Sequence, residues 1–461
     1  MSSFYIENFG CRASQADGVA IARSLTDRGL DSGAAAKADF VVLNTCTVTA
    51  DADRAARAAA RRLHAHNPNA RILVTGCYAQ RAPDEVAALP GVAWVAGNSH
   101  KHQIADILLP AAFVSLRSLA GAAIHVADIF AHTELLAAPV FGPADARTRP
   151  TLKVQDGCDN RCSFCVIPSV RGQSRSRKLE QVIQDVNSLV AAGFQEVVIS
   201  GINLGRWGRD FTPSATFEAL LEAILEQTVV PKLRLSSVEP MDWSDRLIAL
   251  AASSPRIARH AHVPMQSGSD TVLRRMHRKY RPWHYRDKIT RIHEAVPIAA
   301  IGADVMTGFP GETDAEFEET SRLVEELPLT YLHIFPYSPR PGTPAASLPN
   351  QVPVHVARER RLTLSNLILR KKRAFADSFV GQTLPAITLH STSQDSTSAL
   401  TDNFLELEIQ GRYEANRWHT VHIESSSEGT LKGRLAESNA AFPVGTSFVA
   451  PRLGGESLSQ P

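Results

Sequence analysis

The sequence lacks any uninterrupted apolar run long enough to cross a bilayer, which takes about 20 residues. Residues 1–5 also lack a basic region leading into an apolar stretch, so we expect no signal peptide. Cysteine is scarce, with six residues in a chain of 461. Because no export signal accompanies these cysteines, we expect reduced thiols and a cytoplasmic protein rather than three disulfides.

Excess charge of either sign is also missing. The chain has 49 basic and 47 acidic residues, a net charge of +2. Such a balance excludes no partner, because local clusters of charge matter more than the total. With 461 residues and 44% hydrophobic content, the chain can bury an ample core. About three domains are expected, at about 150 residues each.

Three of the cysteines, Cys158, Cys162 and Cys165, lie close together in a loop preceded by Gly157. Thiolates are the ligands that iron-sulfur clusters need, and a four-iron cluster with three protein ligands leaves one iron open. Structural zinc normally takes four ligands, and no His or fourth Cys follows at zinc-finger spacing. The spacing therefore favours an open iron-sulfur cluster over structural zinc or three buried structural thiols.

The other three cysteines each follow a predicted strand in the first 145 residues. Short apolar runs at 4–9, 40–44 and 72–75 alternate with alanine-rich helical segments, which is typical of a parallel sheet flanked by helices. The cysteines that follow these runs are Cys11, Cys46 and Cys77. Since loops after parallel strands lie at one edge of a sheet, we expect the three to meet. The alternative is that each is a small buried apolar residue.

From about residue 150 a longer repeat of strand and helix begins. The predicted strands cover residues 151–154, 196–200, 233–238, 260–264, 301–306 and 332–336. The helical segments between them are long enough for crossover connections. Eight such units would close a barrel, so six predict an open, partial (β/α)6 barrel with its chemistry at the carboxyl edge. The cysteine triplet follows the first strand and belongs to that edge.

The last part of the chain has a different pattern. A long helix is predicted over residues 354–379. Beyond it the chain is rich in Ser and Thr, with alternating runs such as 404–409 and 419–423. These runs predict a small antiparallel β-barrel.

Together these features resemble the radical S-adenosylmethionine (SAM) methylthiotransferases over nearly the whole chain. The stretches that carry the resemblance are residues 44–49, 74–80, 155–172, 308–313 and 335–343. Residues 46–49 and 77–80 make it closest to the branch acting on tRNA threonylcarbamoyladenosine, the modified adenosine 3′ of the anticodon. The family usually carries Asn where this chain has Ser14, so hydrogen bonding near Cys11 is expected to differ.

The resemblance implies an α/β fold in three parts and two clusters. The expected domains are an N-terminal methylthiotransferase domain (1–145), a radical SAM domain (146–378) and a TRAM-like β-barrel (379–454), with a tail at 455–461. A SAM-binding 4Fe-4S cluster is assigned to Cys158, Cys162 and Cys165, and an auxiliary 4Fe-4S cluster to Cys11, Cys46 and Cys77. The first would cleave SAM to a deoxyadenosyl radical, and the second would hold the sulfur. A reductant such as flavodoxin or ferredoxin is the implied electron donor.

Several residues at the ends of the predicted barrel strands are candidates for SAM contacts. Ser200, Gly201 and Asn203 belong to a Gly-rich loop whose backbone is expected to approach the amino acid part of SAM closely. Glu239 and Gln266 end the third and fourth strands and are expected near the ribose or adenine. The alternatives are an ordinary tight loop and solvated surface side chains.

Clusters of basic residues favour an RNA substrate over a protein substrate. Arg171, Arg175 and Arg177 are nearest in sequence to the SAM cluster and are predicted to hold phosphates of a tRNA anticodon loop. Further clusters occur within 54–61 and 274–281, and a solvated helix face is the alternative for each. From Ser378 on, five basic residues face nine acidic ones, so the C-terminal barrel attracts RNA poorly unless its charges segregate. The regions before it are expected to supply much of the RNA contact.

The sequence is also compatible with other functions. A different methylthiolation substrate is one alternative, either tRNA carrying isopentenyladenosine or a ribosomal protein side chain. A non-enzymatic iron-sulfur carrier is another. A carrier would need neither a SAM-binding barrel nor two differently housed cysteine triplets, so the sequence favours an enzyme.

Overall fold

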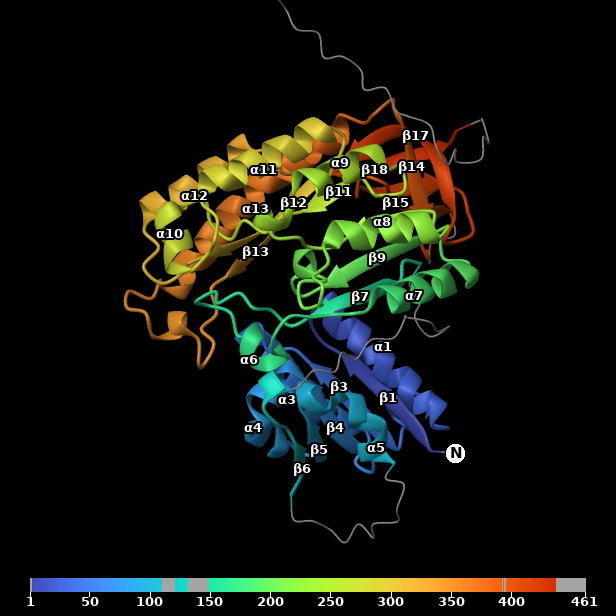
Figure 1. The fold of residues 1–461 in the computed structure, drawn as a ribbon, viewed down its shortest axis with the longest axis vertical. Helices are drawn as coiled ribbons and strands as arrows, with labels where there is room; N and C mark the ends of the chain where they lie inside the picture. Colours follow the sequence, from blue (N-terminus) through green and yellow to red (C-terminus); the bar gives the residue numbers. More distant parts are fainter. Residues whose placement is uncertain (1, 110–120, 132–147, 392, 394, 437–461) are drawn as a thin grey trace, which may run out of the picture.

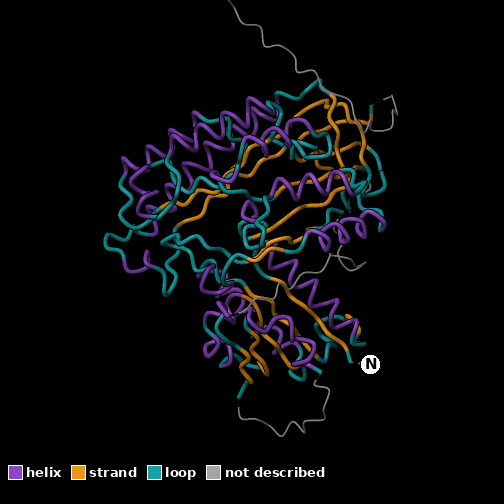
Figure 2. Tube along the Cα trace, in the orientation of Figure 1, coloured by secondary structure: helices purple, strands orange, loops and turns teal. Residues whose placement is uncertain are grey.

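The structure is a computed structural model that describes residues 2–109, 121–131, 148–391, 393 and 395–436. Figure 1 shows three regions that follow one another along the chain: a blue N-terminal region at the bottom, a green to orange middle region, and a red barrel at the upper right. Figure 2 shows the strands of the middle region as an inner layer, with helices outside them. No helix among the described residues has the length and apolar character needed to cross a membrane.

The N-terminal region is a parallel sheet with strand order β2-β1-β3-β4-β5-β6. Its strands are β1 (Ser3–Asn8), β2 (Asp31–Ser32), β3 (Phe40–Thr45), β4 (Arg71–Gly76), β5 (Val92–Ala96) and β6 (Ala123–His125). The helices between them are α1 (Arg12–Asp27), α2 (Ala50–His66), α3 (Cys77–Arg81), α4 (Pro83–Ala87), η1 (Asn98–Gln103) and α5 (Ile104–Leu108). The strand order reverses at β1 and β3, which is where ligands bind in sheets of this kind.

Every residue of β3 is buried because helices cover both faces of the sheet. Val41 and Leu43 pack with Leu63 of α2 on one face. Val42 packs with Ile21 of α1 on the other. The continuous apolar run of this strand therefore reflects burial on two sides.

The middle region contains six parallel strands that form an open, curved sheet. They are β7 (Thr151–Asp156), β9 (Glu196–Gly201), β10 (Lys232–Leu235), β11 (His260–His262), β12 (Ala300–Thr307) and β13 (Tyr331–Pro336). Isolated bridges connect β10 to β11, and the short strand β8 (Arg175–Ser176) pairs with the edge of β7. Among the described residues no pairing joins β13 to β7, so the barrel is open on that side.

Residues alternate between two faces along these strands. Apolar side chains such as Val154, Ile199 and Ile301 face the surrounding helices. These helices are α7 (Leu179–Ala191), α8 (Phe217–Gln227), α9 (Asp245–Ser253), α11 (Pro282–Ala295), α12 (Asp314–Glu326) and α13 (Val354–Asp377). The opposite, concave face is largely polar and carries Lys153, Gln155, Glu196, Arg234, His262 and Asp304.

The C-terminal region is a closed barrel with strand order β14-β15-β16-β18-β17. Its strands are β14 (Thr383–Thr388), β15 (Ser396–Thr401), β16 (Glu406–Gln410), β17 (Trp418–Ser427) and β18 (Thr430–Leu435). The prediction of an antiparallel barrel is confirmed with one exception, because β16 and β18 pair in parallel. Asp402 forms an ion pair with Lys232 at the start of β10, so this barrel packs at the amino ends of the middle strands.

The predicted fold class is confirmed: a parallel-sheet α/β region, an open six-stranded barrel and a small closed barrel. The sequence did not predict the short or edge strands β2, β6 and β8, which carry few apolar residues, or the longer β5. The predicted domain ends at 145 and 454, and the tail 455–461, lie outside the described residues.

Candidate active site

The first cysteine triplet lies in the loop after β7, at the carboxyl edge of the open barrel. The backbone N–H of Cys158 donates to Gly172 O at 3.1 Å, and the N–H of Cys165 donates to Cys162 O at 3.1 Å. Gly157 has a φ of +72°, and a Cβ on it would lie 1.9 Å from the carbonyl oxygen of Gln173. Only glycine therefore allows the cysteine loop to fold back against this segment.

Polar side chains from the loop after β9 and from the segment after α10 (Asp270–Arg275) donate to these sulfurs. The Asn203 amide nitrogen lies 3.5 Å from Cys158 Sγ, and Arg278 Nη1 lies 3.3 Å from Cys162 Sγ. Arg278 also pairs with Glu239. Burial, together with the neighbouring Cys162, raises the pKa of Cys165 to about 12. Such thiols ionise when a metal binds them, and the nearby donors then stabilise the thiolates, so this set fits an iron-sulfur cluster.

The residues predicted to contact SAM lie at the carboxyl ends of β9, β10 and β11. Asn203 and Glu239 are brought next to the cysteine loop, as described above. Asn203 Oδ1 and Gln266 Oε1 are buried, with no hydrogen-bond partner among the described residues. Since buried polar atoms are nearly always hydrogen bonded, two such oxygens fit a polar ligand at this edge. A pocket beside Cys162 is lined by Glu239, Arg278 and Tyr280 among others.

Two residues of the predicted Gly-rich loop have other neighbours. Ser200 is buried within β9. A Cβ on Gly201 would lie 3.0 Å from Gln155 Oε1, so this glycine makes room for Gln155. Gln155 Oε1 in turn accepts a hydrogen bond from the backbone N–H of Asn203 at 2.7 Å. The loop is thus shaped by a side chain of β7.

The second triplet lies at the carboxyl ends of three adjacent strands. Cys11 follows β1, Cys46 follows β3, and Cys77 follows β4. Gly10 has a φ of +94°, and a Cβ on it would lie 2.6 Å from Cys46 Cβ, which shows how closely the first two loops approach. Burial, with Cys77 and Cys11 nearby, raises the pKa of Cys46 to about 11. Three converging thiols of this kind fit a second cluster.

The short helix α6 (Ile167–Arg171) connects the two triplets. It begins two residues after Cys165, and its Val170 packs against Cys77. The side-chain amide of Asn98 donates to Val170 O at 2.7 Å and lies 3.5 Å from Cys77 Sγ. Sequence reasoning missed Asn98, because nothing in its local sequence marks it as a neighbour of a cysteine.

A buried ion network lies beside α6. Arg171 pairs with Asp156 at 2.8 Å and with Asp17 of α1 at 3.1 Å, and Lys153 pairs with both carboxylates. Lys101 pairs with Asp17 at 2.8 Å. Burial opposes the charge of Arg171, but Asp156 and Cys77 raise its pKa well above the ordinary value. Three cations against two carboxylates give the network one excess positive charge.

Two family models and several known proteins match this chain. The radical SAM superfamily matches residues 152–324, and the uncharacterized protein family UPF0004 matches residues 3–97. Threonylcarbamoyladenosine tRNA methylthiotransferase MtaB of Bacillus subtilis is 35% identical, covering 89% of this chain and 91% of that protein. The chain belongs to the radical SAM tRNA methylthiotransferase family.

The relatives of this methylthiotransferase include proteins named for two different tRNA nucleosides. MtaB of Aquifex aeolicus is 34% identical, covering 90% of this chain and 99% of that protein. The tRNA-2-methylthio-N(6)-dimethylallyladenosine synthase of Novosphingobium aromaticivorans is 31% identical, covering 94% and 97%. The radical SAM methyltransferase TsrM from Kitasatospora setae shares the fold, with a TM-score of 0.54, 15% identity and coverage of 75% and 77%.

The arginines predicted to bind RNA are not equally available in the methylthiotransferase. Arg171 is 2% exposed and fully paired, so the prediction that it contacts phosphate is contradicted by its position. Arg175 is half-buried and donates to Arg171 O at 2.8 Å. Arg177 pairs with Asp185, and its side chain is 12% exposed. Burial lowers the pKa of both Arg175 and Arg177, and their contact with RNA stays a prediction.

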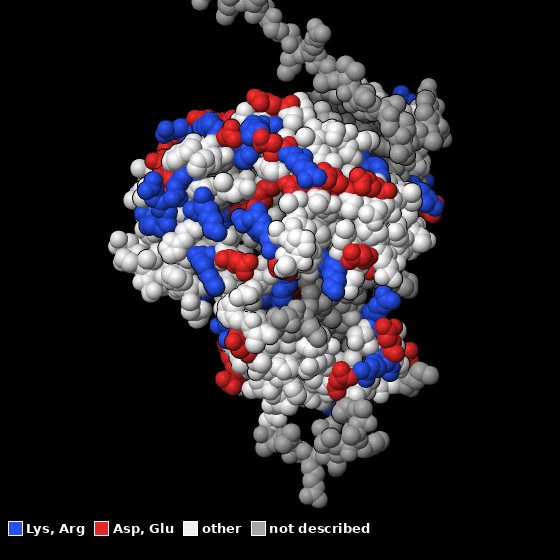
Figure 3. All heavy atoms as spheres, viewed as in Figure 1, with Lys and Arg blue, Asp and Glu red and all other residues white. Residues whose placement is uncertain are grey.

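Basic side chains do gather elsewhere on the surface. Figure 3 shows Lys and Arg crowded on the left face, over the part of the molecule where α10 (Asp270–Arg275) lies. Arg274 and Arg281 both pair with Asp270 in this region. Lys279 is exposed and lines the pocket beside Cys162. Within the predicted basic cluster 274–281, Arg278 donates a hydrogen bond to Cys162, while Lys279 is exposed to solvent.

The segment after β13 fastens the barrel to the loop that carries Cys46. Arg340 Nη2 donates to Thr47 Oγ1 at 2.9 Å and also pairs with Asp53. Arg81 binds the same two residues, at 2.8 Å and 2.9 Å. Arg340 is 3% exposed, so this contact is part of a buried interface. The stretch 335–343 carries part of the family resemblance, but the residue that Arg340 contacts, Thr47, lies 293 residues earlier in the chain.

Proposed function

We propose that the protein transfers a methylthio group to C2 of N6-threonylcarbamoyladenosine, next to the anticodon of tRNA. The observation that carries this proposal is the pair of cysteine triplets, all of them free, at the carboxyl edges of two parallel sheets connected by α6. The similarity to MtaB proteins at 32–35% identity over most of the chain supports the choice of nucleoside.

Cys158, Cys162 and Cys165 would hold one 4Fe-4S cluster, whose open iron binds SAM. When bound, this cluster supplies the electron that cleaves a carbon–sulfur bond of SAM. Arg278 donates to Cys162 and holds Glu239 at the rim of the pocket. The buried side-chain oxygens of Asn203 and Gln266 would accept hydrogen bonds from polar groups of SAM. Ser200 and Gly201, at the end of β9, lead into the loop that carries Asn203.

Cys11, Cys46 and Cys77 would hold the second 4Fe-4S cluster, where the transferred sulfur resides. The buried network around Arg171 supports this assignment through its charge. Positive charge stabilises the more negative, reduced form of a cluster and its thiolate ligands. The excess positive charge next to Cys77 therefore favours electron uptake there.

The tRNA would present its adenosine unstacked at the carboxyl edge, because single-stranded RNA loops are read with their bases splayed out. Arg175, Arg177 and Lys279 lie around that edge and would hold phosphates of the anticodon loop. A small reductant such as flavodoxin or ferredoxin would supply electrons in the cytoplasm. We assign residues 1–145 to an N-terminal methylthiotransferase domain, residues 146–378 to a radical SAM domain and residues 379–454 to a TRAM-like barrel.

The experiment that tests this function counts iron and products. Anaerobically reconstituted protein should hold about eight irons, from two four-iron clusters. Replacing Cys158, Cys162 and Cys165 by Ala should halve the iron and abolish SAM cleavage. Replacing the other three cysteines should also halve the iron, but leave SAM cleavage intact while methylthio transfer stops. Stoichiometric zinc in place of iron would refute the assignment.

The nucleoside itself is tested in cells. Transfer RNA from a strain lacking the gene should lose 2-methylthio-threonylcarbamoyladenosine, as measured by mass spectrometry of nucleosides. Loss of 2-methylthio-dimethylallyladenosine instead would assign the protein to the other tRNA substrate. If the tRNA nucleosides are unchanged and a ribosomal protein loses its methylthio group instead, the substrate is a protein.

A further inference from the structure

Three polar residues lie together on the concave face of the barrel. His262 is on β11, Asp304 on β12 and His333 on β13. Their neighbours in sequence, such as Ala303 and Leu332, pack against the helix side of the sheet. Because side chains alternate along a strand, the three polar residues face the interior of the open barrel. Asp304 and His333 are also direct partners across the β12–β13 ladder.

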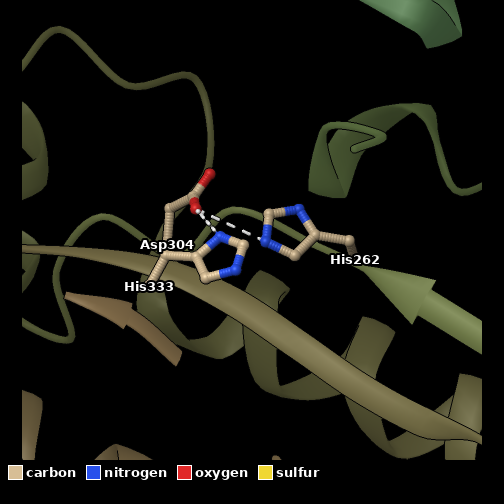
Figure 4. A group of neighbouring side chains, drawn as sticks. All are labelled: His262, Asp304 and His333. Atoms are coloured by element: carbon tan, nitrogen blue, oxygen red, sulfur yellow. Dashed lines mark hydrogen bonds and ion pairs between the residues drawn. The ribbon is translucent and has the colours of Figure 1, made fainter. Parts of the chain in front are cut away.

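Figure 4 shows both imidazoles pointing at the carboxylate of Asp304. His333 Nδ1 lies 3.2 Å from Asp304 Oδ1, and His262 Nε2 lies 3.4 Å from the same oxygen. Burial alone would raise the pKa of Asp304, but the two histidines beside its carboxylate lower this pKa below its usual range. An ionised carboxylate only accepts hydrogen bonds, so Nδ1 of His333 carries the proton that faces Asp304.

This arrangement fixes one nitrogen of His333 and leaves the other available. The structure records no hydrogen bond to Nε2 of His333 from the described residues, and its side chain is 65% exposed. His262, by contrast, is 9% exposed and serves as a support. His333 also lies on β13, the edge strand of the open side, whose following segment carries Arg340 to the Cys46 loop. It therefore lies on the open side of the barrel, on the strand that leads into the segment contacting the Cys46 loop.

We propose that His333 is a specificity-determining residue whose Nε2 hydrogen bonds to the polar substituent on N6 of the substrate adenosine. The proposal rests on the proposed function. A threonylcarbamoyl group offers N–H, O–H and carboxylate groups, whereas a dimethylallyl group offers only C–H bonds. A site built around a hydrogen bond discriminates against an analogue that lacks the partner, because its own polar atom then stays unpaired.

The surroundings of His333 also suit a polar substituent. His262 lies beside it, with ring centroids 5.2 Å apart, and Tyr331 lies 5.6 Å away on the same strand. Further toward the C-terminal barrel, His260 stacks on Tyr331, and Phe404 packs against Tyr331 at a tilt. Donors and acceptors thus face the interior at the level of His333, and aromatic rings lie beneath them.

A metal ion is the competing explanation for the same residues. The three ligand atoms lie within 4.8 Å of one another, which a metal could also use. His333 Nδ1 hydrogen bonds to Asp304 Oδ1, whereas His262 Nε2 lies 3.4 Å from the same oxygen and has no hydrogen-bond partner among the described residues. The experiment below therefore includes a metal measurement.

The test compares the full-length, reconstituted protein with His333→Phe and His333→Leu, which remove the hydrogen bond, and His333→Gln, which keeps a polar group. His355→Phe on the exposed start of α13 is the matched control. Affinity is measured by fluorescence anisotropy on anticodon stem-loops carrying threonylcarbamoyladenosine, dimethylallyladenosine or plain adenosine. Kinetics are then measured with the corresponding tRNAs, alongside the iron, zinc and manganese content and SAM cleavage without tRNA.

The apolar variants should bind the threonylcarbamoyl stem-loop about tenfold more weakly, the value of one good hydrogen bond. Their affinity for the other two stem-loops should not change, and the kinetic loss should appear in KM. His333→Gln should retain part of the preference, and His355→Phe all of it. Iron content and SAM cleavage should stay at the wild-type level in every variant.

Three results would overturn this inference. The first two are an unchanged preference in both apolar variants, and zinc or manganese bound stoichiometrically only when His333 is present. A lower kcat at constant KM would also count against it, because it would indicate a role in the reaction rather than in recognition. If instead the wild-type protein prefers dimethylallyladenosine, the proposed function itself fails. The stem-loop series therefore separates the two failures.

Discussion

Replacing Gly10 by Ala should remove the second cluster while leaving the first in place. Gly10 precedes Cys11 and has a φ of +94°, a conformation that L side chains rarely adopt. The new Cβ would lie 2.6 Å from Cys46 Cβ and 2.9 Å from Cys46 Sγ. The substitution therefore acts on two of the three thiols of this site at once.

The size of the effect follows from these distances. Ordinary contact begins at 3.4 Å, so Cys46 or the Gly10 loop must move by about 0.8 Å. Ligand positions in metal sites tolerate deviations of about 0.2 Å. The left-handed backbone adds about 1–2 kcal/mol of strain to the folded state. The displacement is thus too large for the three sulfurs to keep their geometry.

Gly29 offers a matched control in the turn after α1. Its φ is +84°, and a Cβ on it would meet no atom within 4 Å. Gly29→Ala should therefore show the same backbone strain, about 1–2 kcal/mol, without disturbing a cysteine. A comparison of the two variants separates backbone strain from the collision with Cys46.

The assay is iron content after anaerobic reconstitution, followed by SAM cleavage and methylthio transfer. Gly10→Ala should hold about half the iron of Gly29→Ala, cleave SAM normally and transfer no methylthio group. Equal iron content and equal transfer in the two variants would refute the argument that the collision with Cys46 prevents the second cluster from forming. Loss of SAM cleavage in folded Gly10→Ala would refute the independence of the two sites.

Three further predictions concern buried polar contacts. Arg340→Met should retain iron and SAM cleavage but lower methylthio transfer about tenfold, because the Cys46 loop loses its contact with the barrel. Product analysis measures the transfer, and transfer equal to that of the wild-type protein would contradict the prediction. Arg171→Met should lower the free energy of unfolding by about 3–5 kcal/mol in denaturant titrations, because Asp17 and Asp156 stay buried with fewer cations; a loss below about 1 kcal/mol contradicts it. Burial lowers the pKa of His260 in the folded protein well below 6.5. Just below pH 6.5, His260 therefore gains a proton in the unfolded protein but not in the folded one. Stability should then fall by up to about 1.4 kcal/mol per pH unit below pH 6.5, and His260→Gln should reduce this slope.

The sequence by itself determined the features that depend on local patterns. Apolar runs placed β1, β3 and β4, and the rule that parallel strands end at one edge brought Cys11, Cys46 and Cys77 together. The spacing of Cys158, Cys162 and Cys165 is itself local, so the cluster loop could be recognised without a fold. Hydrophobic periodicity identifies strands and helices, and six strand-helix units instead of eight were enough to predict an open barrel.

Only the tertiary structure decided which polar residues serve the site. Arg171 follows the cysteine loop like a surface arginine, yet it is buried against Asp17, which lies 154 residues earlier. His333 alternates with apolar residues as any strand histidine could, and its availability depends on Asp304 of the neighbouring strand. Hydrogen bonds and ion pairs depend on distance in space, which no local pattern encodes. The fold therefore had to be known before these residues could be given roles.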